Sequence, residues 1–125
     1  MDVDFLCGDY VVEYDERSHF TSARLATFSH YPDGVAFGYD VEAYKRLVTL
    51  HRAAGDKGFA HKSASEFPGP AGRMRQRAYF DAFRDLAAPT LQGHPALRVA
   101  SPEEDPALGL ERFEACLVFS GSRTS

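Results

Sequence analysis

The sequence has no tryptophan, only two cysteines and no long apolar segment. Cys7 and Cys116 form neither a CxxC redox pair nor a zinc-knuckle spacing, so we expect both to be reduced thiols in the core. The apolar runs fall far short of the roughly 20 residues that cross a bilayer, and the acidic start Met-Asp-Val-Asp-Phe is unlike a signal peptide. These absences predict a cytoplasmic protein without a membrane segment.

Several enzyme motifs are also missing. The chain contains no GxSxG nucleophile elbow, no GxxxxGK[ST] phosphate loop and no GxGxxG dinucleotide loop. Its five histidines never form HxH or HExxH, so we expect neither a metal site nor a cofactor. A net charge of −4 argues against nucleic acid as the partner. Missing motifs weigh only moderately against catalysis, so the sequence leaves open whether the protein is an enzyme.

What is present has the size and composition of one globular domain, which we expect to span residues 1–125. The order of patterns predicts an α+β domain, with a mostly antiparallel sheet of four to six strands and two helices packed on one face. Strands are expected over 3–14 with a β-bulge at Gly8, over 20–28, over 35–39, over 97–100 and over 113–119. For residues 19–29 a helix is an open alternative.

Two stretches have helical periodicity. Asp40 can cap a helix over 41–54 that Gly55 ends, with Tyr44, Leu47, Val48 and His51 on the inner side. A second helix is expected over 71–87, ended by Pro89. Its expected inner face is Tyr79, Ala82, Phe83 and Leu86, and its expected outer face is Arg77, Asp81, Arg84 and Asp85. A long loop over 55–72 and a frayed tail over 120–125 complete the prediction.

Charge is unevenly distributed, because residues 1–16 hold six acids and no base. Alternation with a phase change at Gly8 predicts one exposed acidic strand face, made of Asp2, Asp4, Asp9, Glu13 and Asp15, above buried Phe5, Val12 and Tyr14. Such carboxylates can simply keep edge strands apart. They would also attract a basic protein surface, so the sequence favours a non-catalytic binding protein: an inhibitor, an immunity-type protein or an assembly subunit. Self-association is compatible with this prediction.

The alternative function uses a basic stretch. Lys57, Arg73, Arg75 and Arg77 are candidates for binding an anion, because arginines at a helix start oppose the helix dipole unless an anion or acidic group is near. His51 and His61 are candidate acid or base groups. Together they would describe a small enzyme, or a binder of anionic small molecules, with its pocket between helices and sheet. The simpler interpretation is that His51 packs in the core or interacts with free carbonyls at the last turn of its helix. In the same interpretation the Arg75 side chain extends along apolar surface to solvent, and the other arginines are solvated or pair with the acidic strand.

Overall fold

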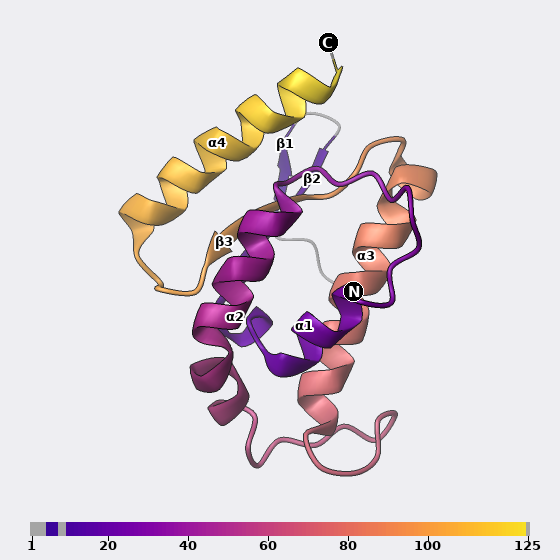
Figure 1. Cartoon of the computed structure of the whole chain (residues 1–125), viewed down its shortest axis with the longest axis vertical. Coiled ribbons are helices and arrows are strands. Elements are labelled where there is room, and N and C mark those ends of the chain that lie inside the picture. The colour runs from indigo at the N-terminus through magenta and orange to yellow at the C-terminus, as the bar shows by residue number, and fades with distance from the viewer. Residues whose placement is uncertain (1–4, 8–9, 125) are drawn as a thin grey trace.

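The computed structural model describes residues 5–7 and 10–124, and Figure 1 shows four helices arranged around a small sheet in this part of the chain. The elements are β1 (Phe5–Cys7), β2 (Tyr10–Glu16), the 3₁₀ turn η1 (Arg17–His19), α1 (Ser22–Phe28), α2 (Val41–Lys57), α3 (Gly72–Gln92), β3 (Leu97–Ser101) and α4 (Pro106–Thr124).

The sheet in the described residues has three strands in the order β1-β2-β3. β1 and β2 are antiparallel, with Cys7 opposite Tyr10, whereas β2 and β3 are parallel, with Val12 opposite Leu97. A parallel pair needs a long crossover, and α1, α2 and α3 provide it. The predicted sheet of four to six mostly antiparallel strands, with two helices on one face, is therefore wrong.

Helices cover both faces of this sheet. On one face Val12, Leu97 and Val99 pack against Cys116 and the half-buried Phe113 of α4. On the other face a cluster from α1, α2, β3 and the connecting segments is formed by Phe20, Phe28, Tyr39, Tyr44, Val48 and Ala100. Because helices cover both faces of the sheet, β2 does not have the solvent-exposed acidic face that the sequence predicted.

Several predicted strands have another structure, although the strand expected over 97–100 is confirmed as β3. The expected strand over 3–14 is two strands that pair with each other, so the phase change marks a chain reversal between Cys7 and Tyr10. Gly8 itself lies outside the described residues. Residues 22–28 form α1, the open alternative, because Thr21 caps it by accepting a bond from the Arg24 backbone N–H at 3.1 Å.

The two other wrong strands were predicted from aromatic spacing. Residues 35–39 form no strand, because their rings pack into the core, with Phe37 stacked on Tyr31 at 5.7 Å. Residues 113–119 belong to α4, where Phe113 and Cys116, three positions apart, face the sheet. A frayed tail was expected over 120–125, whereas α4 continues to Thr124.

The helix predicted over 41–54 is confirmed and extends to Lys57. Asp40 caps it, accepting a bond from the Ala43 N–H at 3.1 Å, and Tyr44 and Val48 are buried. Gly55 lies inside α2, where an added Cβ would stand 2.0 Å from the backbone oxygen of Phe20. The glycine therefore allows close packing of α2, rather than ending the helix.

The helix predicted over 71–87 exists as α3, but its faces are reversed. Asp81 and Asp85 are 4% and 3% exposed, whereas Phe83 is 43% exposed. Pro89 lies within the last turns, and α3 continues to Gln92 before Gly93 takes a φ of 80°. The reversal places charge in the interior and aromatic rings in solvent.

The structure bears on two further predictions, the reduced core cysteines and the absence of a membrane segment. Cys116 is a free, buried cysteine whose thiol donates to the Gly38 carbonyl at 3.6 Å, while the side chain of Cys7 lies outside the described residues. Burial raises the pKa of the Cys116 thiol, which makes it unreactive. Among the described helices none is long and apolar enough to cross a membrane.

Candidate functional site

The interior between the sheet and α3 contains six charged or titratable side chains in mutual contact, which we call the buried charge cluster. Its members are Asp15 from β2, His19 from η1, Arg24 from α1, Asp81 and Asp85 from α3, and Arg98 from β3. Side chains of this kind are almost never fully buried unless they are paired. Except for the neighbours Asp15 and His19, the paired side chains come from parts of the chain that are far apart in sequence.

Asp85 accepts hydrogen bonds from four donors. Its Oδ2 accepts from Arg24 Nη2 at 2.8 Å and from the hydroxyls of Tyr31 and Tyr39 at 2.7 Å each. Its Oδ1 accepts from Arg98 Nε at 2.8 Å. Burial raises the pKa of the Asp85 carboxyl, but the two guanidiniums and their hydrogen bonds outweigh it, so the pKa is lowered.

Arg98 joins the strand side of the cluster to the helix side. Its Nη1 donates to Asp15 Oδ2 at 2.9 Å, and its Nη2 donates to the backbone oxygen of Asp81 at 2.9 Å. Tyr44 completes the Asp15 shell, since its hydroxyl donates to Asp15 Oδ2 at 2.5 Å. Arg98 thus connects two layers of the fold, in addition to holding Asp85.

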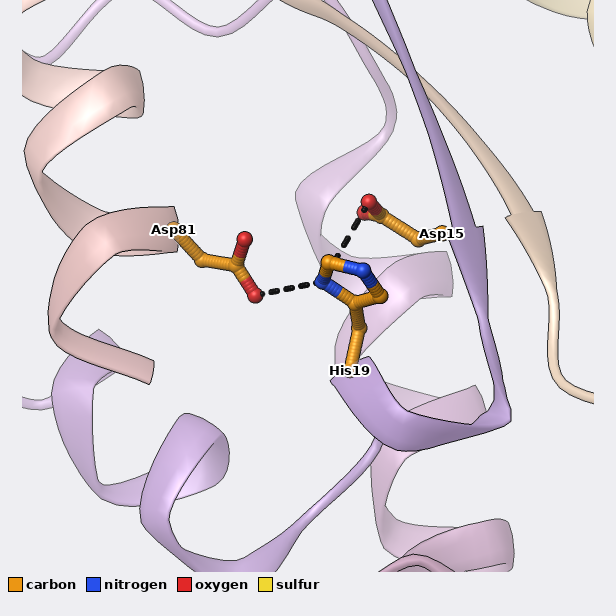
Figure 2. A group of neighbouring side chains, drawn as sticks. All are labelled: Asp15, His19 and Asp81. Atoms are coloured by element: carbon orange, nitrogen blue, oxygen red, sulfur yellow. Dashed lines mark hydrogen bonds and ion pairs between the residues drawn. The ribbon is translucent and has the colours of Figure 1, made fainter. Parts of the chain in front are cut away.

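His19 lies between two carboxylates, as Figure 2 shows, with Asp81 approaching from α3 and Asp15 from β2. Its Nδ1 is 2.8 Å from Asp81 Oδ2 and 3.6 Å from Asp15 Oδ1, while Arg77 Nη1 is 3.3 Å from Nε2. Burial favours the neutral ring, and so does the guanidinium of Arg98. The two carboxylates outweigh these effects and raise the pKa of His19.

Carboxylates and guanidiniums act on His19 in opposite directions. Asp15 and Asp81 lie on its Nδ1 side and favour the protonated ring, whereas the guanidiniums of Arg98 and of Arg77, 3.3 Å from Nε2, favour the neutral ring. The pKa of the Asp81 carboxyl is lowered, because Arg98 and His19 outweigh its burial. The proton on His19 is therefore favoured by the two carboxylates next to its Nδ1.

Asp15, His19 and Asp81 also have ligand atoms within 4.8 Å of one another, a spacing compatible with a metal ion. Arg98 occupies the same region, with Nη1 2.9 Å from Asp15 Oδ2 and 3.6 Å from Asp81 Oδ1. A cation would have to compete with this guanidinium for the same oxygens. We therefore interpret the group as part of an ion-pair cluster that holds the fold.

The raised pKa of His19 predicts a pH dependence of stability. The contribution of the His19 proton is fully present below the unfolded value of about 6.5 and is lost as pH rises through the folded value. The free energy of unfolding, measured by urea denaturation, should decrease as pH rises above about 6.5. His19→Gln, which keeps a donor for Asp81 but does not titrate, should remove that decrease. An equal decrease in the variant would contradict the placement of this proton.

A second notable feature, after the buried charge cluster, is the solvent-facing side of α3. We call its exposed side chains the aromatic face: Tyr79, Phe80, Phe83 and Leu86, which are 51%, 40%, 43% and 41% exposed. Tyr79 is in ring contact with Phe80 and Phe83, and Phe67 from the preceding loop packs on it. Beside this face lies an open groove of about 550 Å³ that is lined by residues of α1 and α3.

Among the predicted site residues, the acidic strand face is wrong for the part that the structure describes. Glu13 and Asp15 are 3% and 0% exposed, whereas Tyr14 is 39% exposed. Arg84 holds Glu13 with two bonds of 2.7 Å, and Arg98 holds Asp15, so the carboxylates turn inward toward cations. Burial raises the pKa of Glu13 in spite of these arginines.

The rest of that prediction is tested only in part. The predicted burial of Val12 is confirmed. The acids Asp2, Asp4 and Asp9 lie outside the described residues, and so does the side chain of Phe5.

The candidate anion-binding residues do not converge. Arg75 Nη2 donates to the Pro68 carbonyl at 2.6 Å, Arg77 contacts His19, and Arg73 donates to the Gln76 side chain. Lys57 is exposed at the end of α2. The partners of these arginines are thus an amide, loop carbonyls and a histidine rather than the acidic strand, and anion binding stays a prediction.

The candidate acid and base groups also lie apart from the charge cluster. His51 Nε2 is 4.0 Å from Glu103 Oε2, which is itself bonded to Arg112 at 2.8 Å. That pair lowers the pKa of Glu103 to about 2, through the hydrogen bond from Arg112. His61 is exposed in the connection between α2 and α3. Their roles in catalysis stay predictions.

The sequence analysis missed the cluster itself. Two signals pointed to it: Asp81 and Asp85 are one helical turn apart, and Arg98 is the one charge in the apolar stretch 97–100. Neither signal identifies which residues pair with Asp81, Asp85 or Arg98, because those residues lie more than ten positions away in the sequence.

Comparison of the chain with family models, with curated proteins and with solved structures finds no match.

Proposed function

We propose that this chain is a non-catalytic protein-binding domain that docks through the aromatic face of α3. The observation that carries the proposal is the reversed orientation of α3, with Asp81 and Asp85 inside and Phe80 and Phe83 outside. Aromatic residues are enriched at protein interfaces, and contiguous exposed apolar patches mark such sites.

The energetic reason is the apolar area that docking removes from water. Full burial of a Phe or Tyr covers roughly 150 to 250 Å², so four side chains that are about half exposed present on the order of 350 Å². At about 25 cal/mol per Å² this area is worth roughly 9 kcal/mol before the costs of association. Without a partner, the aromatic face stays in water and this free energy of apolar burial is not gained.

This proposal keeps the binding class that the sequence favoured but changes the surface. Glu13 forms an ion pair with Arg84, and Asp15 forms one with Arg98, so neither carboxylate is accessible to a basic partner. Of the roles considered, an assembly subunit fits an apolar docking face better than an inhibitor or immunity-type protein that relies on charge. We place the domain in the cytoplasm, where the buried thiol of Cys116 stays reduced.

The alternative function, a small enzyme or a binder of anionic molecules, has less support. The structure places its candidate residues in different environments: His51, His61, Arg73 and Arg75. In the described part of the chain they therefore do not combine an acid or base with an anion-binding group at one site.

Photo-crosslinking in the cells that naturally contain the chain tests the proposed function. Benzoylphenylalanine at position 83 should give one discrete protein adduct on irradiation. The same group at position 50, where Leu50 is 73% exposed on α2, is the matched control and should give none. Absence of an adduct from position 83, or equal adducts from both positions, would contradict docking through α3.

A further inference from the structure

We propose that the groove lined by α1 and α3 binds a long-chain fatty acid, with the apolar chain in the groove and the carboxylate against Arg75. The inference goes beyond the proposed function and does not rest on it, because Phe80 and Phe83 of the aromatic face do not line the groove. A fatty acid has one apolar chain and one charge at its end. The groove has a counterpart for each.

The groove has the shape of an extended chain. Its α3 wall is a single stripe of side chains at helical spacing: Ala71, Met74, Arg75, Ala78, Tyr79, Ala82 and Leu86. The stripe runs over fifteen positions, which at about 1.5 Å per residue is about 22 Å along α3. The groove volume of about 550 Å³ is in the range of small-molecule sites. A long, narrow shape suits a flexible chain better than a compact ring system.

The walls of the groove are apolar, and their hydroxyls are already used. Alanines on both helices give the groove its depth: Ala23, Ala26, Ala78 and Ala82. The hydroxyls of Ser22, Thr27 and Tyr31 also line it, but each donates to another group of the chain, at 2.6 to 2.7 Å. A ligand with many polar groups would find few partners along these walls, whereas methylene groups need none.

Arg75 supplies a positive charge near the end of the groove where α3 begins. Its Nη2 donates to three loop carbonyls at 3.3, 2.6 and 3.3 Å, those of Phe67, Pro68 and Pro70, which hold the guanidinium in place. Within the described residues nothing accepts from its Nε or Nη1, and the side chain is exposed, so these donors are open to a ligand. A carboxylate oxygen is a strong acceptor for a guanidinium.

The surroundings of Arg75 contain no acid that would compensate this charge. Of the described residues that line the groove, none is Asp or Glu. The first turn of α3 has no acidic residue, and its N-cap, Ala71, makes no side-chain bond. Glu66, the acid of the preceding loop, is bonded to Ser65 and Gln76 and does not line the groove. Negative charge is favourable near the start of a helix, so this end of the groove selects an anionic head group.

Isothermal titration calorimetry of the purified chain with monomeric dodecanoate tests the inference. Dodecylammonium, which has the same tail and the opposite charge, is the matched probe. We expect one dodecanoate per chain with a dissociation constant of about 10 to 100 µM, and binding of dodecylammonium weaker by about 10-fold or more. The chain has a net charge of −4, so unspecific adsorption would favour the cation. The expected preference is the opposite one.

Two variants test the head and the tail of the ligand separately. Arg75→Gln removes the charge, and Ala26→Phe fills the groove from an exposed position of α1. Each should weaken dodecanoate binding by about 10-fold or more. Arg52→Gln and Ala53→Phe make the same changes at exposed positions of α2 and should bind like the wild type. Circular dichroism should show that all four variants are folded.

Three results would overturn the fatty-acid proposal: no binding of dodecanoate up to about 1 mM, dodecylammonium that binds as tightly, or groove variants that bind like the wild type. Binding to phosphatidylglycerol vesicles without binding of monomeric dodecanoate would assign the groove to a membrane surface and would also contradict the proposal. The crosslink from position 83 tests protein docking independently, so either proposal can fail while the other stands.

Discussion

Replacing Arg98 with methionine should lower the free energy of unfolding by about 3 to 5 kcal/mol, because it removes the guanidinium that the buried Asp15 and Asp85 share and leaves Asp85 with Arg24 alone. Arg98 donates to Asp15, to Asp85 and to the backbone of Asp81, and its side chain is fully buried. Methionine has a similar length and keeps most of the volume. Urea denaturation followed by circular dichroism at neutral pH measures the loss.

Arg112→Met is the matched control for this change. Arg112 also holds a carboxylate, Glu103, with bonds of 2.6 and 2.8 Å, but both side chains are more than a quarter exposed. Exposed pairs of this kind contribute about 1 kcal/mol or less. A loss from Arg98→Met no larger than the loss from Arg112→Met would show that the buried charge cluster does not hold the fold.

The cluster is better understood as a device for orientation than as a source of net stability. Burying charged groups costs solvation free energy that can exceed the gain from their attraction, so a buried ion-pair cluster is weak evidence for net stability. What the cluster does decide is which side of α3 faces the sheet, since Asp81 and Asp85 meet cations on only one side. The exposed aromatic face follows directly from that choice.

The orientation of α3 shows what sequence reasoning lacked. α2 was predicted with its correct inner face, because Tyr44 and Val48 meet an apolar layer, the situation that helical periodicity assumes. In α3 the same rule put Phe83 inside and Asp85 outside. It failed because Arg24 and Arg98, far away in sequence, provide the polar surroundings that water was expected to provide. No local window contains that information.

The fold class was wrong for a related reason. Phe113, Ala115 and Leu117 alternate like a strand, yet they belong to α4, because short apolar stretches carry both periods equally well. The parallel pairing of β2 with β3 depends on the three-helix crossover, which the sequence showed only in parts. The arginines Arg75 and Arg77 were predicted to bind an anion, whereas the contacts that the structure gives them are internal, and anion binding stays a prediction.

Two substitutions on α3, two positions apart, test its orientation through the free energy of unfolding at low chain concentration, where self-association is negligible. Asp85→Ala removes the carboxylate that accepts from four donors, three of them buried, so we expect a loss of about 3 to 5 kcal/mol. Phe83→Ser changes an exposed ring, so we expect a loss of about 1 kcal/mol or less. A larger loss for Phe83→Ser than for Asp85→Ala would contradict the reversed orientation of α3, and with it the docking surface.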